Sequence, residues 1–173
     1  MMKNIVLIGL LLSSLAIQAQ AYPRFDNNHE LKFNAGLFLA TGSVEGSYEY
    51  FFTEDTSFGG TVYFDNDATD YNGDFGIGPN LRAYFGYQPR SGLFVEAFGL
   101  YYTWDEENLQ ENINFRNQNY STVALGLGLG NKWVTPSDNF TLEIYGGVGR
   151  NVNPEEFQDT FMFRGALAIG FRF

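Results

Sequence analysis

Apolar and polar residues alternate along most of this chain. In the closing run, 161–173, one face would carry Phe161, Phe163, Leu167, Ile169, Phe171 and Phe173, and the other small residues with Arg164 and Arg172. A period of two is typical of a β-strand whose faces meet different surroundings. The alternation recurs over 29–40, 43–52, 57–64, 75–86, 93–104, 122–133 and 139–150. The sequence therefore predicts eight strands of about ten residues, a length that crosses a bilayer at a tilt.

The connections between these strands add a second pattern. The first, 40–43, is short; from the second onward, short connections (53–56, 87–92, 134–138) alternate with long ones (65–74, 105–118, 151–160). Membrane barrels of outer-membrane type have short turns on the periplasmic side and longer loops outside. We predict an all-β fold, an eight-stranded antiparallel up-and-down transmembrane β-barrel, with both ends of the mature chain in the periplasm.

Charged residues in the strands fall on one face, opposite the aliphatic set. They are Lys32, Glu45, Glu49, Arg82, Glu96, Lys132, Glu143, Arg164 and Arg172. A Lys or Arg facing lipid at midplane costs about 2–4 kcal/mol, so this face should point inward in a membrane barrel. A soluble barrel, with the aliphatic face inward, fits the alternation equally well, but its water-facing side would usually carry more charge. Arg150 is the exception, at the predicted outer rim.

Eight strands leave an interior just wide enough for side chains to fill it. Buried unpaired charges are costly, so we predict that these nine residues form an internal network of salt bridges and hydrogen bonds, with Tyr63, Tyr84 and Tyr145 nearby. Alternation does not give the position of each residue along the barrel axis, so the sequence does not predict which acid pairs with which base. The alternative is that the charges line a narrow pore, as in a small porin or ligand-carrying barrel. At Pro79, which cannot donate a ladder hydrogen bond, we expect a bulge or a strand end.

The three long loops are acidic. They hold Asp65, Asp67, Asp70, Asp74, Asp105, Glu106, Glu107, Glu111, Glu155, Glu156 and Asp159 against one base, Arg116, and so match the net charge of −10 of the whole chain. Such residues keep exposed loops solvated, and they could also meet divalent cations or an extracellular protein. The run from Asp65 to Asp74 lacks the terminal Glu of an EF-hand loop, and we predict no metal site.

The N-terminus indicates export. One Lys precedes an apolar run, 5–17, and Ala19 and Ala21 occupy the −3 and −1 positions of a cleavage site. We predict a secretory signal peptide over 1–21 and a barrel domain over 22–173. The chain contains no Cys, so no disulfide holds the fold together.

These features resemble the small outer-membrane barrels of the OmpA/OmpX type. Stretches such as IGPNLRAYFGY, LFVEAFGLYY and LEIYGGVGRN are also similar to the "outer membrane protein beta-barrel domain" of bacterial proteins. The resemblance implies a Gram-negative outer membrane with its lipid and lipopolysaccharide as surroundings. It also implies that the final strand, ending in Phe171 and Phe173, is the recognition signal for the barrel-assembly machinery.

The candidate chemistry for an enzyme is sparse. Some eight-stranded outer-membrane barrels modify lipid A with a His, a Ser and an acid, but His29 is the one His of the chain and precedes the first predicted strand. With no Cys, a Cys/His pair is excluded. We expect a non-enzymatic barrel with a structural or surface-interaction role, without cofactor or nucleic-acid partner. A soluble lipocalin-like carrier is a further alternative, whose distinguishing feature would be an apolar interior.

Overall fold

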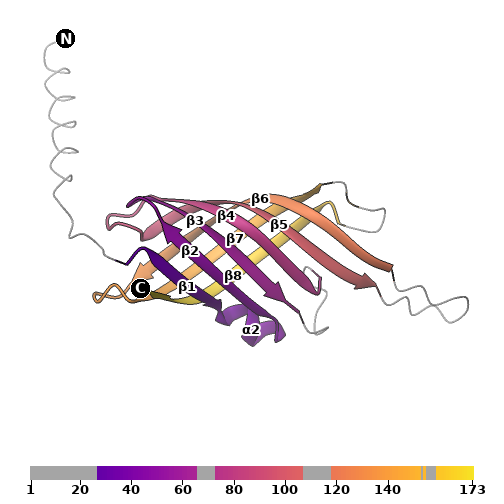
Figure 1. Cartoon of the computed structure of the whole chain (residues 1–173), viewed down its shortest axis with the longest axis horizontal. Helices are drawn as coiled ribbons and strands as arrows, with labels where there is room; N and C mark the ends of the chain where they lie inside the picture. Colours follow the sequence, from indigo (N-terminus) through magenta and orange to yellow (C-terminus); the bar gives the residue numbers. More distant parts are fainter. Residues whose placement is uncertain (1–26, 66–72, 107–117, 153, 155–158) are drawn as a thin grey trace, which may run out of the picture.

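The chain folds into a closed barrel of eight antiparallel strands (Figure 1). The structure is a computed structural model and describes residues 27–65, 73–106, 118–152, 154 and 159–173. The strands are β1 (His29–Asn34), β2 (Val44–Phe51), β3 (Thr56–Phe64), β4 (Phe75–Tyr84), β5 (Gly92–Glu106), β6 (Gln118–Val134), β7 (Phe140–Val152) and β8 (Phe161–Arg172). Each strand pairs with its chain neighbours, and β8 pairs with β1. The predicted barrel is confirmed, whereas the proposed signal peptide lies outside the described residues.

Side chains alternate between the outside and the bore along each strand. In β7, Phe140, Leu142 and Ile144 are exposed, whereas Glu143 and Tyr145 are buried. The other strands follow the same rule, so the barrel presents an aliphatic and aromatic surface and encloses its charged residues. The two predicted faces are thus placed with the apolar set outward.

The short connections lie together at one end of the barrel, here called the turn end. They comprise residues 52–55, 85–91 and 135–139. The last residue also lies there, because the backbone N–H of Phe173 donates to the carbonyl of His29 at 2.9 Å, and the His29 N–H donates to the Phe173 carbonyl at 3.2 Å. At the opposite end, here called the loop end, β3, β5 and β7 end and β4, β6 and β8 begin.

Strand lengths depart from the predicted ten residues. β5 spans 15 residues and β6 spans 17, and they pair as far as Glu106 with Gln118. Asp105 and Glu106, expected in a loop, therefore have strand backbone. Pairing of a hairpin satisfies backbone hydrogen bonds whatever its side chains are, so it can continue past the end of the apolar pattern.

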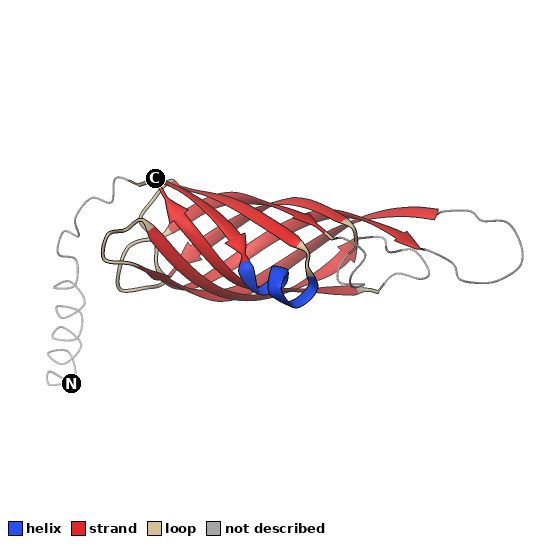
Figure 2. Ribbon diagram, turned by 90° about the horizontal axis from the view of Figure 1, so that it is seen from below, coloured by secondary structure: helices blue, strands red, loops and turns tan. Residues whose placement is uncertain are grey.

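The expected strand 29–40 is shorter than predicted. β1 stops at Asn34 and the chain forms a helix, α2 (Ala35–Thr41), which lies against β8 and β2 (Figure 2). Ala and Leu favour a helix, and a short apolar run does not distinguish the two structures. Gly42 ends the helix with a φ of 82°, a left-handed conformation that glycine adopts readily. Among the described residues, no helix is long and apolar enough to cross a membrane.

The side chain of Asn34 makes this change of structure possible. Its Oδ1 accepts hydrogen bonds from the backbone N–H of Leu37 at 3.1 Å and of Leu167 at 3.2 Å, and its Nδ2 donates to the Gly165 carbonyl at 3.1 Å. The amide thus caps α2 and extends the ladder along β8 where β1 has ended.

Pro79 produces neither a bulge nor a strand end, and that expectation was wrong. β4 continues through it, with Pro79 exposed on the outer face opposite Gly60. Toward β5 the pairs Ile77–Tyr101 and Asn80–Phe98 keep the same register on both sides, and only the two positions between them are missing from the ladder. A two-residue gap accommodates the absent N–H group.

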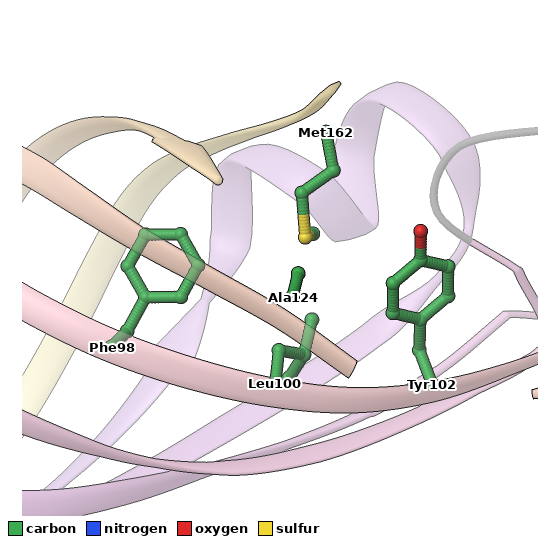
Figure 3. Packing of buried hydrophobic residues seen from close by; sticks show 5 residues of the cluster. All are labelled: Phe98, Leu100, Tyr102, Ala124 and Met162. Carbon is green, nitrogen blue, oxygen red and sulfur yellow. The ribbon is translucent and has the colours of Figure 1, made fainter. Parts of the chain in front are cut away.

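Aromatic rings fill the bore together with the charges. Phe98, Leu100, Tyr102, Ala124 and Met162 form one cluster (Figure 3), and Phe51, Tyr84, Phe94 and Tyr145 form another. The line of glycines in β6 makes room for these rings. A Cβ on Gly126 would overlap the Phe98 ring, one on Gly130 the Phe94 ring, and one on Gly128 the Tyr145 ring. The large rings from β5 and β7 thus occupy the space that the glycines of β6 leave free.

We predict that Asn34→Ala destabilises the barrel by about 1–3 kcal/mol, since it leaves buried backbone groups of α2 and β8 without their partner. The free energy of unfolding in urea, measured in lipid vesicles, checks this. Asn131→Ala is the control, because Asn131 lies half buried on the outer face of β6. An equal loss in both variants would contradict the capping role.

Candidate functional site

The centre of the charged interior is the ammonium group of Lys132 on β6. Its Nζ lies 2.8 Å from Glu49 Oε2, 3.2 Å from Glu30 Oε2 and 3.6 Å from Glu143 Oε2. These carboxylates come from β2, β1 and β7, so one side chain connects four strands. All four residues are fully buried.

Two further cations contact the same carboxylates. Lys32 Nζ lies 2.7 Å from Glu49 and 3.2 Å from Glu143. Arg82 binds Glu96 through Nε at 2.6 Å and reaches Glu143 at 2.7 Å and Glu49 at 3.4 Å through Nη1. Glu49 therefore meets three positive charges, each from a different strand.

Hydroxyl groups complete the shell around the carboxylates. The Tyr84 hydroxyl accepts from Lys132 Nζ at 2.7 Å and donates to Glu49 Oε1, and the Ser57 hydroxyl donates to the same oxygen at 2.5 Å. Thr141 donates to Glu30 Oε1 at 2.8 Å. Buried ion pairs are tolerated when such additional hydrogen bonds satisfy their remaining oxygens.

Arg164 extends the network toward the loop end. It lies 3.4 Å from Glu45 and 3.7 Å from Glu96, and its guanidinium stacks 5.0 Å from the Phe98 ring centre. This pair is less buried than the central group. It joins the charged layer to the aromatic cluster of Figure 3.

Arg172 closes the network at the turn end. Its Nε donates to Glu30 and its Nη1 to Asp138, both at 2.8 Å, and its Nη2 donates to the Arg90 carbonyl at 2.6 Å. Arg90 and Asp138 lie in two different turns, both with positive φ. Burial and the neighbouring positive charge of Arg172 lower the pKa of the Arg90 guanidinium. One strand residue thus ties the last strand to β1 and to two turns.

The nine charged residues named from the sequence all lie in the bore. Ion pairs join them into one network together with one further charged residue of the bore. The additional residue is Glu30, which falls within the predicted strand 29–40 but was not included in the predicted charged set. Its parity with Lys32 along β1 was the available signal. With Glu30 included, the set holds five acids and five bases and its formal charge is zero. Of the three tyrosines expected nearby, Tyr84 joins the network, and Tyr63 and Tyr145 are buried in the bore.

The three carboxylates around Lys132 have the composition of a cation site. Oxygens of Glu30, Glu49 and Glu143 lie within 4.8 Å of one another, which suits hard divalent ions. The ammonium of Lys132 already takes the position that such an ion would need. The arrangement therefore acts as an internal charge clamp in which the cation is part of the chain.

The acidic loop residues are only partly described. Asp67, Asp70, Glu107, Glu111, Glu155 and Glu156 lie outside the described residues. Asp65 accepts a hydrogen bond from the Ser43 hydroxyl at 2.6 Å, its backbone N–H donates to the Asp74 carbonyl, and the Asp159 carbonyl accepts from Asn151. These contacts attach the ends of two loops to the barrel.

The last two aromatic residues lie on the outside at the turn end. Phe171 pairs with Leu31 and Phe140, and Phe173 stacks on His29 with ring centres 5.6 Å apart. His29 is the first residue of β1 and not part of a preceding turn, and its Nδ1 lies 2.6 Å from the Tyr48 hydroxyl. His29, at the start of β1, therefore belongs to an aromatic group that contacts the end of β8, where the first and last strands of the barrel meet.

The family model described as "Protein of unknown function (DUF3575)" matches residues 5–159. The chain belongs to this family. No curated protein matches the sequence. The crystal structure of the N-terminal β-barrel domain of Pseudomonas aeruginosa OprF is similar in fold, with a TM-score of 0.61 and 19% sequence identity, over 85% of this chain and 98% of that one. The resemblance to outer-membrane barrels is thus supported at the level of fold.

We predict that Lys132→Met lowers the free energy of unfolding by about 3–5 kcal/mol, because it leaves three buried carboxylates with one cation fewer. The deficit should shrink as the pH falls, since a carboxyl that takes up a proton restores the balance of charge. Urea unfolding at several pH values measures both effects. Arg150→Met is the control, because Arg150 is exposed outside the network. A deficit that does not vary with pH would contradict the clamp.

Proposed function

We propose that this protein is a non-enzymatic outer-membrane β-barrel with a bore filled by paired charges and a structural or surface-interaction role. The observation that carries the proposal is the distribution of charge across the barrel wall. Aliphatic and aromatic side chains cover the outside, while five acids and five bases meet within it. A bilayer requires this inverted arrangement, and water does not.

The outer surface supports a lipid environment in detail. Among the strand residues whose side chains the structure describes (which leaves out 104–106 and 118–120), Arg150 is the one charged side chain on the outer face, and it lies near the loop end. The cost of a lipid-facing Arg falls from about 2–4 kcal/mol at midplane to about 0–1 near the interface, so this position is compatible with a membrane. The predicted signal peptide and the fold shared with the OprF domain add to this support.

The charged interior favours a membrane barrel with a filled bore over a soluble carrier or an open channel. A lipocalin-like carrier needs an apolar interior, and the turn-end half of this bore holds Lys132, Arg172 and their carboxylate partners instead. These side chains bridge opposite parts of the wall and connect two of the three turns at that end. Paired charges also leave little for catalysis, since each is held by its neighbours. The acidic loops are the part of the chain proposed to meet cations, lipopolysaccharide or an extracellular protein.

The proposal is tested by gel mobility together with conductance. We expect protein from the outer-membrane fraction to resist SDS until heated and then to shift, because a closed barrel keeps its strand pairing in detergent. In planar bilayers we expect no stable discrete conductance steps, since the bore is filled. A soluble protein without a heat shift would contradict the membrane barrel. Stable steps would contradict the filled interior and favour a small porin.

We predict that Phe173→Ala lowers the amount of protein in the outer membrane several-fold, while its stability after refolding in vesicles changes by about 1 kcal/mol or less. The physical reason is that Phe173 is half exposed, so its main role would be recognition by the assembly machinery. Quantitative blots of membrane fractions and urea unfolding give the two values. Phe140→Ala, an exposed aromatic substitution at the same end, is the control. Equal membrane levels of both variants would contradict an assembly signal.

A further inference from the structure

A groove of about 750 Å³ crosses the outer wall of the barrel over β3 to β7. It begins at Thr56, at the turn end of β3, and runs toward the middle of the wall. Its floor lies where Ala83, Ala97 and Gly146 face outward, and larger residues such as Leu127 and Val148 form its sides. This volume falls in the range of sites for small organic ligands.

Strand register brings these small residues together. One row across the wall reads Ala83, Val95, Leu129, Gly146, and the next reads Leu81, Ala97, Leu127, Val148. A Cβ built on Gly146 would meet nothing within 4 Å, so the floor is open there. Leu127, by contrast, is 68% exposed and stands out from the wall. Small residues between large ones allow close approach of an apolar partner.

The lining selects an alkyl chain as the occupant. Arg82 and Glu96 border the groove, but their charged ends pair at 2.6 Å inside the bore. The groove therefore offers aliphatic carbon, and it is continuous with the surface that the proposed function places in lipid. A chain lying there would gain dispersion contacts that a smooth wall does not provide.

Charge at the turn end indicates which kind of lipid headgroup would lie beside an alkyl chain in the groove. Glu54 and Asp55, in the turn directly before Thr56, are exposed, while their backbone carbonyls accept hydrogen bonds from Arg90 and Tyr84. Among the described residues, Arg150 is the one Lys or Arg with an exposed side chain, and it lies toward the opposite end. The Arg90 guanidinium lies close enough to interact with the charge of Glu54, but Arg90 is buried, so the exposed charge of this turn is negative and favours a cationic group.

We propose that this groove is a lipid-binding site that holds one alkyl chain of a phospholipid whose ammonium headgroup lies at Glu54 and Asp55. The inference rests on the proposed function, because it requires the outer wall to face lipid. It adds a lipid of defined chemistry to the barrel wall, on the side of the short turns.

The test is lipid retention by the folded barrel in detergent micelles, measured by native mass spectrometry. The probes are phosphatidylethanolamine and phosphatidylglycerol with identical palmitoyl chains. We expect wild-type protein to retain one phosphatidylethanolamine more strongly than phosphatidylglycerol. Gly146→Leu should lower retention of both on the order of tenfold, because it fills the floor and removes about ten carbon–carbon contacts. Glu54→Gln with Asp55→Asn should abolish the preference between the two lipids.

Gly60→Leu is the matched control. Gly60 also faces outward, on β3, and a Cβ there would make only an ordinary contact of 3.6 Å with the Gly78 carbonyl. It lies outside the groove lining, so this variant should retain lipid as the wild type does. Equal retention by Gly146→Leu and wild type, a preference for phosphatidylglycerol, or a dimer in place of the lipid adduct would each overturn the site.

The heat shift of the same samples separates this inference from the proposed function. Samples that shift on heating but show one of these contrary results would reject the groove and leave the membrane barrel standing. Samples that do not shift and stay soluble without detergent would reject both.

Discussion

The ten charges in the bore must neutralise one another for this barrel to close. Lys132 lies among Glu30, Glu49 and Glu143, and Arg82, Lys32, Arg164 and Arg172 supply the rest of the balance. Removing a charge from water is expensive, and only close pairing with further hydrogen bonds offsets that cost. The remaining architecture is organised around this requirement, because the partners come from seven of the eight strands.

The same requirement specifies the register of the strands. Side chains alternate with a period of two, so a slip by one residue in β7 would move Glu143 to the outer face and bring Ile144 into the bore. In lipid such a slip would expose a charge to hydrocarbon and leave Lys132 and Arg82 short of a partner. The ion pairs therefore select one arrangement of strands, and the glycines of β6 refine it by admitting the rings of Phe94 and Phe98.

Alternation along the chain was sufficient to predict the barrel, the number of strands and the face of each charged residue. It could not predict where a strand ends, because a short run such as Ala35–Thr41 suits helix and strand alike. Glu30 was missed because it lies at the very start of the predicted strand 29–40, where alternation does not say whether a residue belongs to the strand. The individual ion pairs needed the heights of the strands, which follow from register and not from the pattern of any one strand. The outer groove depends on register in the same way, since Ala83, Ala97 and Gly146 lie on three strands.

The proposed function requires the apolar face of this barrel to meet lipid. A single tryptophan at the position of Leu127, introduced as Leu127→Trp with Trp104 and Trp133 both changed to Phe, reports directly on that face. In vesicles, the account predicts strong quenching of its fluorescence by lipids brominated along their acyl chains and weak quenching by aqueous acrylamide. Quenching by acrylamide without an effect of the brominated lipids would contradict the account and place this face in water.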